Sequence, residues 1–198
     1  MKRQPDEAIK EDKLKRLRIL MDLWCKDEID LRFADESGFS LQPSIPYGWL
    51  PIGKQTRIAT EKTLVMNVFG LMACDNELTI YETDKTINAL FIKTCLDDFA
   101  NECFIKQKLT VLVWDNATWH TANLIKDNIP KWEAKGLFLF YLPVASPHLN
   151  KIETLWRKIK YEWLQVKDFL NFKTLHSAIH NIFSNSGQEF NINFTLNY

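Results

Sequence analysis

Apolar and polar positions change period along this chain, and the changes predict an order of helices and strands. Leucine, methionine and tryptophan recur at helical spacing in residues 1–28, which predicts one amphipathic helix there. Runs with strand character follow at 31–35, 56–73 and 77–81. An Asp-Asn pair between the last two runs suits a tight turn. These three segments therefore predict an antiparallel meander.

The second half of the chain alternates between strand and helix patterns. Uninterrupted apolar runs predict strands at 109–114 and 137–142, as expected where both sheet faces are covered. Helices are predicted at 88–104, 121–135, 150–166 and 172–183. This order predicts an α/β domain with a mixed five-stranded sheet, in which two parallel strands extend the meander and helices flank the sheet.

The same pattern suggests how the chain is divided. Residues 1–28 are interpreted as a helix or linker, a candidate remnant of a DNA-binding region, and residues 29–183 as the folded domain. Residues 184–198 form an asparagine-rich tail whose structure the pattern does not predict.

Length and charge restrict the class of protein. At 198 residues, 46% hydrophobic and 25% charged, the chain fits one ordinary globular domain. Its 25 Lys and Arg residues equal its 25 Asp and Glu residues, so net charge does not favour a self-sufficient nucleic-acid-binding protein. Any DNA contacts are expected to be local, or to come from a basic module outside this chain.

Cysteine usage and hydropathy predict a compartment. The four cysteines form no C-x-x-C pair, which favours buried free thiols in a reducing cytosol. No apolar run is long enough to cross a bilayer, and the N-terminus lacks the apolar core of a signal peptide. We therefore expect a cytoplasmic protein without a membrane partner.

Three carboxylates lie where a metal site can be built. Asp35 shares a predicted strand face with Leu31 and Phe33, and a charge among core residues is unfavourable without a compensating ion. Asp115 ends the fourth predicted strand, and Glu153 begins the helix after the fifth. Carboxylates on neighbouring strands, about 4.8 Å apart, can share two divalent ions. Three acids without a Cys or His cluster fit Mg²⁺ better than Zn²⁺.

Each carboxylate also has a purely structural interpretation. Asp35 could precede a turn at a strand end, and Asp115 could begin an Asx turn. Glu153 lies three residues after Asn150, the spacing of a capping box in which Asn150 begins the helix. The metal site is favoured because all three acids occur together at suitable places in the predicted topology.

Other polar residues are candidates for contacts with a phosphate backbone. Asn116 and His120 follow Asp115 closely, and His120 could touch substrate phosphate or orient a ligand. Positive charge lies one to two turns beyond the third acid, at Arg157, Lys158 and Lys160. These three could contact DNA, although a solvated helix face explains them equally well.

Several other kinds of site find little support. His176 and His180 are four residues apart on a predicted helix, but the segment H-S-A-I-H lacks the glutamate of a zinc-protease motif. Surface or packing histidines are therefore favoured. The chain contains neither a glycine-rich phosphate loop nor a G-x-S-x-G motif, which argues against P-loop and Ser-His-Asp chemistry. The tryptophans are interpreted as core residues.

Four segments together resemble the DDE catalytic domain of mariner-type transposases, most closely their bacterial insertion-sequence relatives (DDE superfamily endonucleases). They are D-E-S-G-F at 35–39, W-x-x-x-G at 49–53, D-N-A-x-x-H at 115–120 and L-P-x-x-S-P-H-L-N-x-I-E-x-x-W at 142–156. The resemblance covers roughly residues 29–165 and implies an RNase H-like fold.

The resemblance also implies a reaction. Asp35, Asp115 and Glu153 would be the catalytic, metal-binding triad, holding two Mg²⁺ or Mn²⁺ ions. The substrates would be double-stranded DNA at transposon ends and target, the reactions strand cleavage and strand transfer, and the active form a homo-oligomer on DNA. In a prokaryotic cytoplasm such a protein would be associated with the nucleoid when bound to DNA.

Departures from the family pattern leave alternatives open. The family usually has Pro at the position of Lys151 and Tyr at that of Ala145, both in the loop that leads to Glu153. It also carries N-terminal helix-turn-helix modules, whereas at most one helix precedes this domain. A truncated or split transposase is therefore expected, with a separate helix-turn-helix portion as a partner. An inactive remnant that acts only in binding, or another RNase H-like nuclease, remains the alternative.

Overall fold

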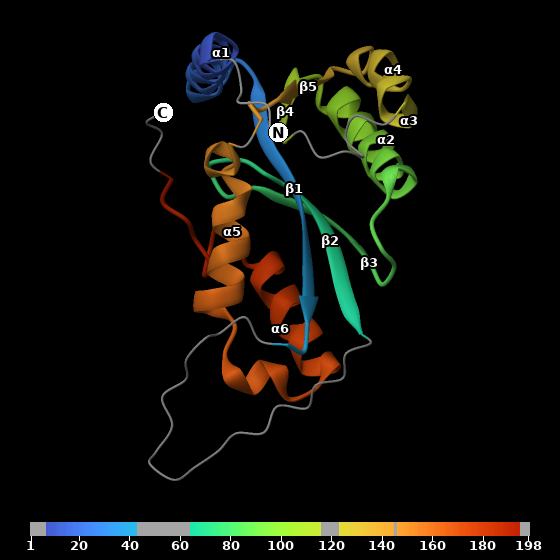
Figure 1. Ribbon diagram of the computed structural model, residues 1–198, viewed down its shortest axis with the longest axis vertical. Coiled ribbons are helices and arrows are strands. Elements are labelled where there is room, and N and C mark those ends of the chain that lie inside the picture. The colour runs from blue at the N-terminus through green and yellow to red at the C-terminus, as the bar shows by residue number, and fades with distance from the viewer. Residues whose placement is uncertain (1–6, 43–63, 116–122, 145, 195–198) are drawn as a thin grey trace.

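A mixed five-stranded sheet forms the centre of the computed structural model, which describes residues 7–42, 64–115, 123–144 and 146–194 (Figure 1). The strands are β1 (Asp30–Ser40), β2 (Val65–Met72), β3 (Leu78–Thr83), β4 (Thr110–Trp114) and β5 (Leu137–Tyr141). Their order is β3-β2-β1-β4-β5, with β1 in the middle. β2 is antiparallel to β1 and β3, whereas β4 is parallel to β1 and β5. The predicted meander with two added parallel strands is confirmed.

Helices cover both faces of the sheet. One apolar cluster packs one face against α1 (Glu7–Cys25), α5 (Ile152–Lys158) and α6 (Phe172–Ser184). A second cluster packs the other face against α2 (Ala89–Lys106), α3 (Asn123–Lys126) and α4 (Ile129–Glu133). Short helical segments complete the fold: η2 (Pro147–Leu149), the π-helix η3 (Ile159–Trp163) and η4 (Val166–Leu170). Of the helices that the structure describes, none is both long and apolar enough to cross a bilayer.

Because side chains alternate along a strand, β1 contributes residues to both apolar clusters. Leu31, Phe33 and Phe39 belong to the α5 side, whereas Ala34 belongs to the α2 side. All five residues of β4 are buried, because this strand is covered on both faces. As predicted, Asp35 therefore follows Leu31 and Phe33 on the α5 face.

β1 is longer than the predicted strand at 31–35. It continues to Ser40 because it pairs with β2 from Phe33↔Met72 to Ser40↔Val65. The segment D-E-S-G at 35–38 is poor in strand-forming residues, and cross-strand pairing outweighs that local preference.

The predicted helix at 121–135 is wrong in one respect, since its described part is two short helices, α3 and α4. Asn128 donates from Nδ2 to the carbonyl of Leu124 across 2.8 Å and so closes the end of α3. Pro130 has no N–H and is tolerated only in the first turn of a helix, where α4 begins. Gly136 then follows α4 with φ of +88°, the conformation expected of a residue that terminates a helix.

The predicted helix at 150–166 also differs. α5 begins at Ile152 and continues as a π-helix to Trp163, so the helical segment ends before Val166. The predicted helices at 88–104 and 172–183 are confirmed as α2 and α6.

Both ends of the described chain pack against the sheet. Leu17 and Met21 of α1 are buried in the α5-side core, and Lys13 Nζ donates to the Leu142 carbonyl across 3.1 Å. The division at residue 28 remains a prediction. Near the other end, Asn76 in the β2–β3 turn donates to the Ile192 carbonyl at 3.1 Å and accepts from its N–H at 2.8 Å. Part of the 184–198 tail is thus docked on this turn.

The four cysteines form no disulfide. Cys95 and Cys103 are buried on α2, as predicted, and Cys74 is partly buried. Cys25 is exposed, contrary to the prediction, because it is the last residue of α1.

Candidate active site

The register of β1 against β4 aligns two of the predicted carboxylates. Phe33 pairs with Val113 in this parallel ladder. The same offset, two residues further along, aligns Asp35 with Asp115, which directly follows the end of β4. Both residues are partly buried. Adjacent parallel strands thus present two acids at the same level of the sheet.

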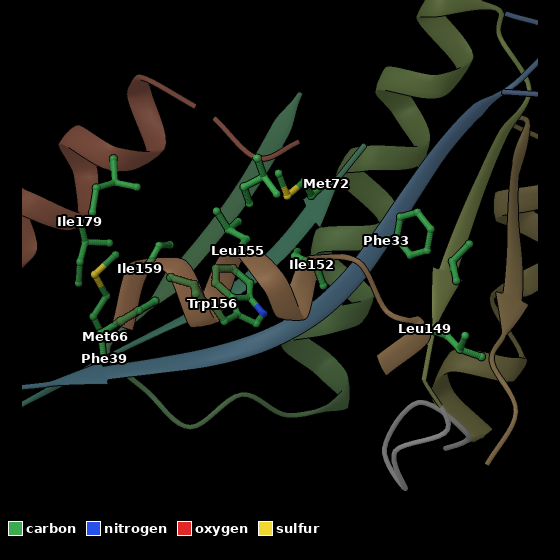
Figure 2. Packing of buried hydrophobic residues seen from close by; sticks show 14 of the residues in the cluster. Phe33, Phe39, Met66, Met72, Leu149, Ile152, Leu155, Trp156, Ile159 and Ile179 are labelled. Carbon is green, nitrogen blue, oxygen red and sulfur yellow. The ribbon is translucent and has the colours of Figure 1, made fainter. Parts of the chain in front are cut away.

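Helix α5 lies against the same face of the sheet and carries the third acid. Glu153 is exposed in the first turn of α5, and Trp156 follows three residues later. The Trp156 indole Nε1 donates to Asp35 Oδ2 across 3.1 Å. Figure 2 shows the Trp156 ring among buried apolar side chains, with its nitrogen directed toward β1. The sequence pattern predicts Trp156 only as a core residue. In the structure it both fills the core and donates a hydrogen bond to Asp35.

Gly70 allows Trp156 to lie in this position. It is the β2 residue directly opposite Asp35. A Cβ atom at Gly70 would lie 2.7 Å from Cη2 and 2.8 Å from Cζ2 of Trp156. Any larger residue would therefore push the indole, and α5 with it, away from the sheet. No motif in the sequence indicated this role for Gly70.

Asn150 fixes the turn that leads into α5. Its Nδ2 donates to the Ala34 carbonyl across 2.8 Å, and the residue is buried. The prediction that Asn150 caps the helix is wrong, because Lys151 occupies the N-cap position and makes no side-chain capping bond. The capping-box interpretation of Glu153 is also wrong, because the Asn150 side chain donates to the β1 backbone and does not cap the helix.

The departure at Lys151 leaves the backbone compatible with the family pattern. Lys151 has φ of −62°, the angle to which proline is restricted. Asn150 before it is extended, with ψ of 104°, as a residue before proline would be. The other departure, Ala145, lies outside the described residues.

Burial of Asp35 and the neighbouring carboxylates determine the electrostatics of the site. Burial, followed by the charges of Glu153, Glu36 and Asp115, raises the pKa of Asp35 to about 8, against the lowering effect of a hydrogen bond from the Glu36 backbone. Burial lowers the pKa of Lys160, while the charges of Asp35 and Glu153 oppose that effect. Ionised Asp35 is thus disfavoured in the protein alone, which is the condition that a bound cation would relieve.

An open cleft of about 700 Å³ borders Glu153, with Trp156, Arg157 and Lys160 also among its lining residues. Lys160 also lies 5.3 Å from the ring centroid of Phe39. Lys158 is not among the cleft-lining residues and pairs with Glu162 instead. The predicted contacts at Asn116 and His120 lie outside the described residues. Of the three basic candidates, the structure brings Arg157 and Lys160 to the cleft.

Comparison with known proteins indicates the family to which the chain belongs. The model of the DDE superfamily endonuclease family matches residues 30–176. Over 64 residues, the chain is 34% identical to uncharacterized protein y4pE/y4sA of Sinorhizobium fredii (strain NBRC 101917 / NGR234). That match covers 31% of this chain and 42% of the relative.

Solved structures of Mos1 transposase share the fold. The catalytic domain of Mos1 mariner transposase superposes with a TM-score of 0.58 at 13% identity, covering 96% of this chain and 88% of that one. The Mos1 mariner paired-end complex with Mn gives a TM-score of 0.61 at 16% identity, covering 94% of this chain and 58% of that one. The chain therefore spans less than two thirds of the longer Mos1 chain. This structural likeness shows the RNase H-like fold. Because the family model matches most of the chain, the chain belongs to the DDE superfamily endonucleases.

Proposed function

We propose that this chain is the catalytic domain of a transposase that cleaves and joins DNA strands, with Asp35, Asp115 and Glu153 as its metal ligands. One observation carries the proposal: Asp35 is held among core residues on the central strand, with Asp115 and Glu153 close enough to raise its pKa. A buried charge among like charges is unfavourable unless a cation shares the site.

The donor set fits Mg²⁺ or Mn²⁺. Carboxylate oxygens are the ligands that these ions prefer, and one cluster of three acids leaves coordination positions for water and phosphate. Structures of the Mos1 catalytic domain include Mg or Mn. When bound, two such ions would activate the attacking oxygen and stabilise the leaving oxygen.

The protein's own contribution is to hold the acids on rigid elements. Trp156 orients the Asp35 carboxylate, and the bond from Asn150 to Ala34 anchors the start of α5 beside it. Glu153 is carried on that helix, so its position depends on both contacts. The mechanism needs this rigidity because the reacting oxygens must be aligned within a fraction of an ångström.

The cleft supports a DNA partner. Arg157 and Lys160 give it positive charge beside the acids, where a phosphate backbone would have to lie. The Mos1 neighbours include a strand transfer complex and a paired-end complex with the left transposon end. We propose double-stranded DNA as the substrate, a homo-oligomer as the form that acts on it, and a separate helix-turn-helix portion for recognition of the ends.

A joining assay distinguishes the competing functions. Purified chain at high concentration is incubated with Mn²⁺, supercoiled plasmid and a labelled duplex that has a free 3′-hydroxyl. We expect plasmid nicking and covalent joining of the labelled strand, both lost in Asp35→Asn, Asp115→Asn and Glu153→Gln but retained in Asp127→Asn. Asp127 is exposed between α3 and α4 and is therefore the matched control. Nicking without joining would indicate a nuclease, and no reaction by a chain that binds both Mn²⁺ and the duplex would indicate an inactive remnant.

A further inference from the structure

A second cluster of metal-binding side chains lies between edge strand β3 and helix α6. His176 and His180 are one turn apart on α6, and Glu82 comes from β3. His180 Nε2 lies 2.7 Å from Glu82 Oε2, and His176 Nε2 lies 3.5 Å from Glu82 Oε1. The donor atoms of the three residues all lie within 4.8 Å of one another. A carboxylate from a distant strand thus joins the two histidines as a third potential metal donor.

The spacing of these donors suits a tetrahedral ion. Zinc binds imidazole nitrogen at about 2.0–2.1 Å and carboxylate oxygen at about 2.0–2.2 Å, which places its ligand atoms about 3.3–3.5 Å apart. The two nitrogen–oxygen distances bracket that separation, so small side-chain rotations would close the site. Two imidazoles and one carboxylate favour Zn²⁺ over Mg²⁺, which prefers oxygen ligands in an octahedral arrangement.

Both elements hold their ligands in place. Leu175, Ile179 and Ile182, on an adjoining side of α6, are buried in the core. The two histidine rings are 4.3 Å apart at an angle of 37°, with Phe172 next to His176 and Phe183 next to His180. Glu82 pairs with Val68 of β2, whose side chain belongs to the same core cluster as α6. The three ligands therefore face a common point from a packed helix and a paired strand.

We propose that Glu82, His176 and His180 form a Zn²⁺ site that fastens α6 to the edge of the sheet. The ion would join residues far apart in the chain. It would also cover part of β3, one side of which pairs with no other strand among the described residues. Its fourth position is left for water. This site is separate from the three acids, and it would stabilise the helix that packs on the far half of β1 through the Phe39–Phe183 ring contact. The proposed Zn²⁺ site does not depend on the proposed transposase reaction.

Titration with Zn²⁺ in an Asp35→Asn/Asp115→Asn background tests the site without interference from the acid cluster. We expect one Zn²⁺ per chain by isothermal calorimetry and a higher Tm on binding. Glu82→Gln, and His176→Asn with His180→Asn, should each weaken binding more than about 100-fold, since losing a group that only orients a ligand already costs about 10–100-fold. Glu133→Gln and His148→Asn, which alter exposed residues elsewhere, should bind as the background does.

A second measurement leaves Glu82, His176 and His180 unchanged, so its result does not depend on whether variants at these positions fold. Zn²⁺ added to the Asp35→Asn/Asp115→Asn protein should shift the imidazole NMR resonances of His176 and His180 but leave those of His148 unchanged. Binding of Co²⁺ should give the visible absorption of a tetrahedral complex. Zn²⁺ affinity that is the same with and without Glu82, or unshifted His176 and His180 resonances at saturating Zn²⁺, would overturn the proposal and leave a hydrogen-bonded His–Glu cluster.

Discussion

Trp156 donates its indole N–H to Asp35 across 3.1 Å, and this bond joins helix α5 to the central strand of the sheet. Glu153 is less than one turn before Trp156 on the same helix. The contact therefore sets how far the third acid lies from the first. It also links an apolar ring that belongs to the core with a carboxylate that belongs to the site.

Replacing Trp156 by Phe separates these two roles. The ring of Trp156→Phe can still fill much of the core, but the donor to Asp35 is lost. We expect a loss of about 1–3 kcal/mol in the free energy of unfolding, and a Mn²⁺ affinity about tenfold weaker because the carboxylate is no longer oriented. Urea denaturation and calorimetric titration measure the two effects. An unchanged Mn²⁺ affinity would show that this bond has no part in metal binding.

Gly70→Ala tests whether the close approach of Trp156 to β2 is required. The added Cβ would overlap the indole at 2.7–2.8 Å, so we expect destabilisation of about 1–3 kcal/mol and weaker Mn²⁺ binding. Gly38→Ala is the matched control, because its Cβ would meet the Asn67 side-chain oxygen at 3.1 Å, an atom that can move. Equal losses of stability in the two variants by urea denaturation would contradict the proposed packing role.

Charge in the cleft should determine the salt dependence of DNA binding. Arg157 borders the cleft, whereas its neighbour Lys158 pairs with Glu162. We expect Arg157→Gln to reduce the slope of log K against log salt concentration by about 0.9, the value for one phosphate contact. Lys158→Gln should leave the slope close to that of the wild-type chain. Fluorescence anisotropy with a labelled duplex measures both, and equal slopes in the two variants would argue against this path for the DNA.

Asp97 should determine part of the stability in acid. It accepts bonds from Lys93 Nζ at 2.6 Å, Trp132 Nε1 at 2.9 Å and Lys131 Nζ at 3.2 Å, and so joins α2 to α4. Burial raises the pKa of Asp97, but these bonds outweigh it and lower the pKa to about 2. Because this folded-state pKa lies below the unfolded value of 3.8, the stabilisation is present above pH 3.8 and is lost as pH falls toward 2.

Asp97→Asn should therefore remove about 1–2 kcal/mol near neutral pH and flatten the decline in stability between pH 4 and pH 2. Urea denaturation across this pH range measures the effect. Asp127→Asn, at an exposed position, is expected to keep the wild-type pH dependence. If both variants decline in parallel with the wild type, the acid sensitivity has another source.

The sheet could be predicted from the sequence because its signals are local. Period-two alternation places Leu31, Phe33 and Asp35 on one face, and the all-apolar run before Asp115 marks a strand covered on both sides. The positions of Asp35 and Asp115 at the same level follow from pairing two such strands.

Contacts between distant residues could not be predicted in this way. Asn150 has the local spacing of a helix cap, but its amide binds the carbonyl of Ala34, 116 residues away. Gly70 has no motif at all, since its role depends on the ring of Trp156. Glu82 joins the two histidines only because β3 and α6 meet in the fold. Sequence spacing predicts which residues share one helix or strand, whereas the roles of Asn150, Gly70 and Glu82 depend on contacts between different elements.

Binding of a divalent ion by Asp35, Asp115 and Glu153 can be measured as a Mn²⁺-dependent thermal shift. A cation that binds only the folded chain raises Tm, by an amount that grows with ion concentration. Glu82→Gln is included as a control, so that binding at the second cluster is not mistaken for binding at the acids. We expect Mn²⁺ to raise the Tm of the wild type, Glu82→Gln and Asp127→Asn, but not that of Asp115→Asn. A Tm that does not respond to Mn²⁺ in the wild type, or responds equally in Asp115→Asn, would show that the three acids do not bind the ion.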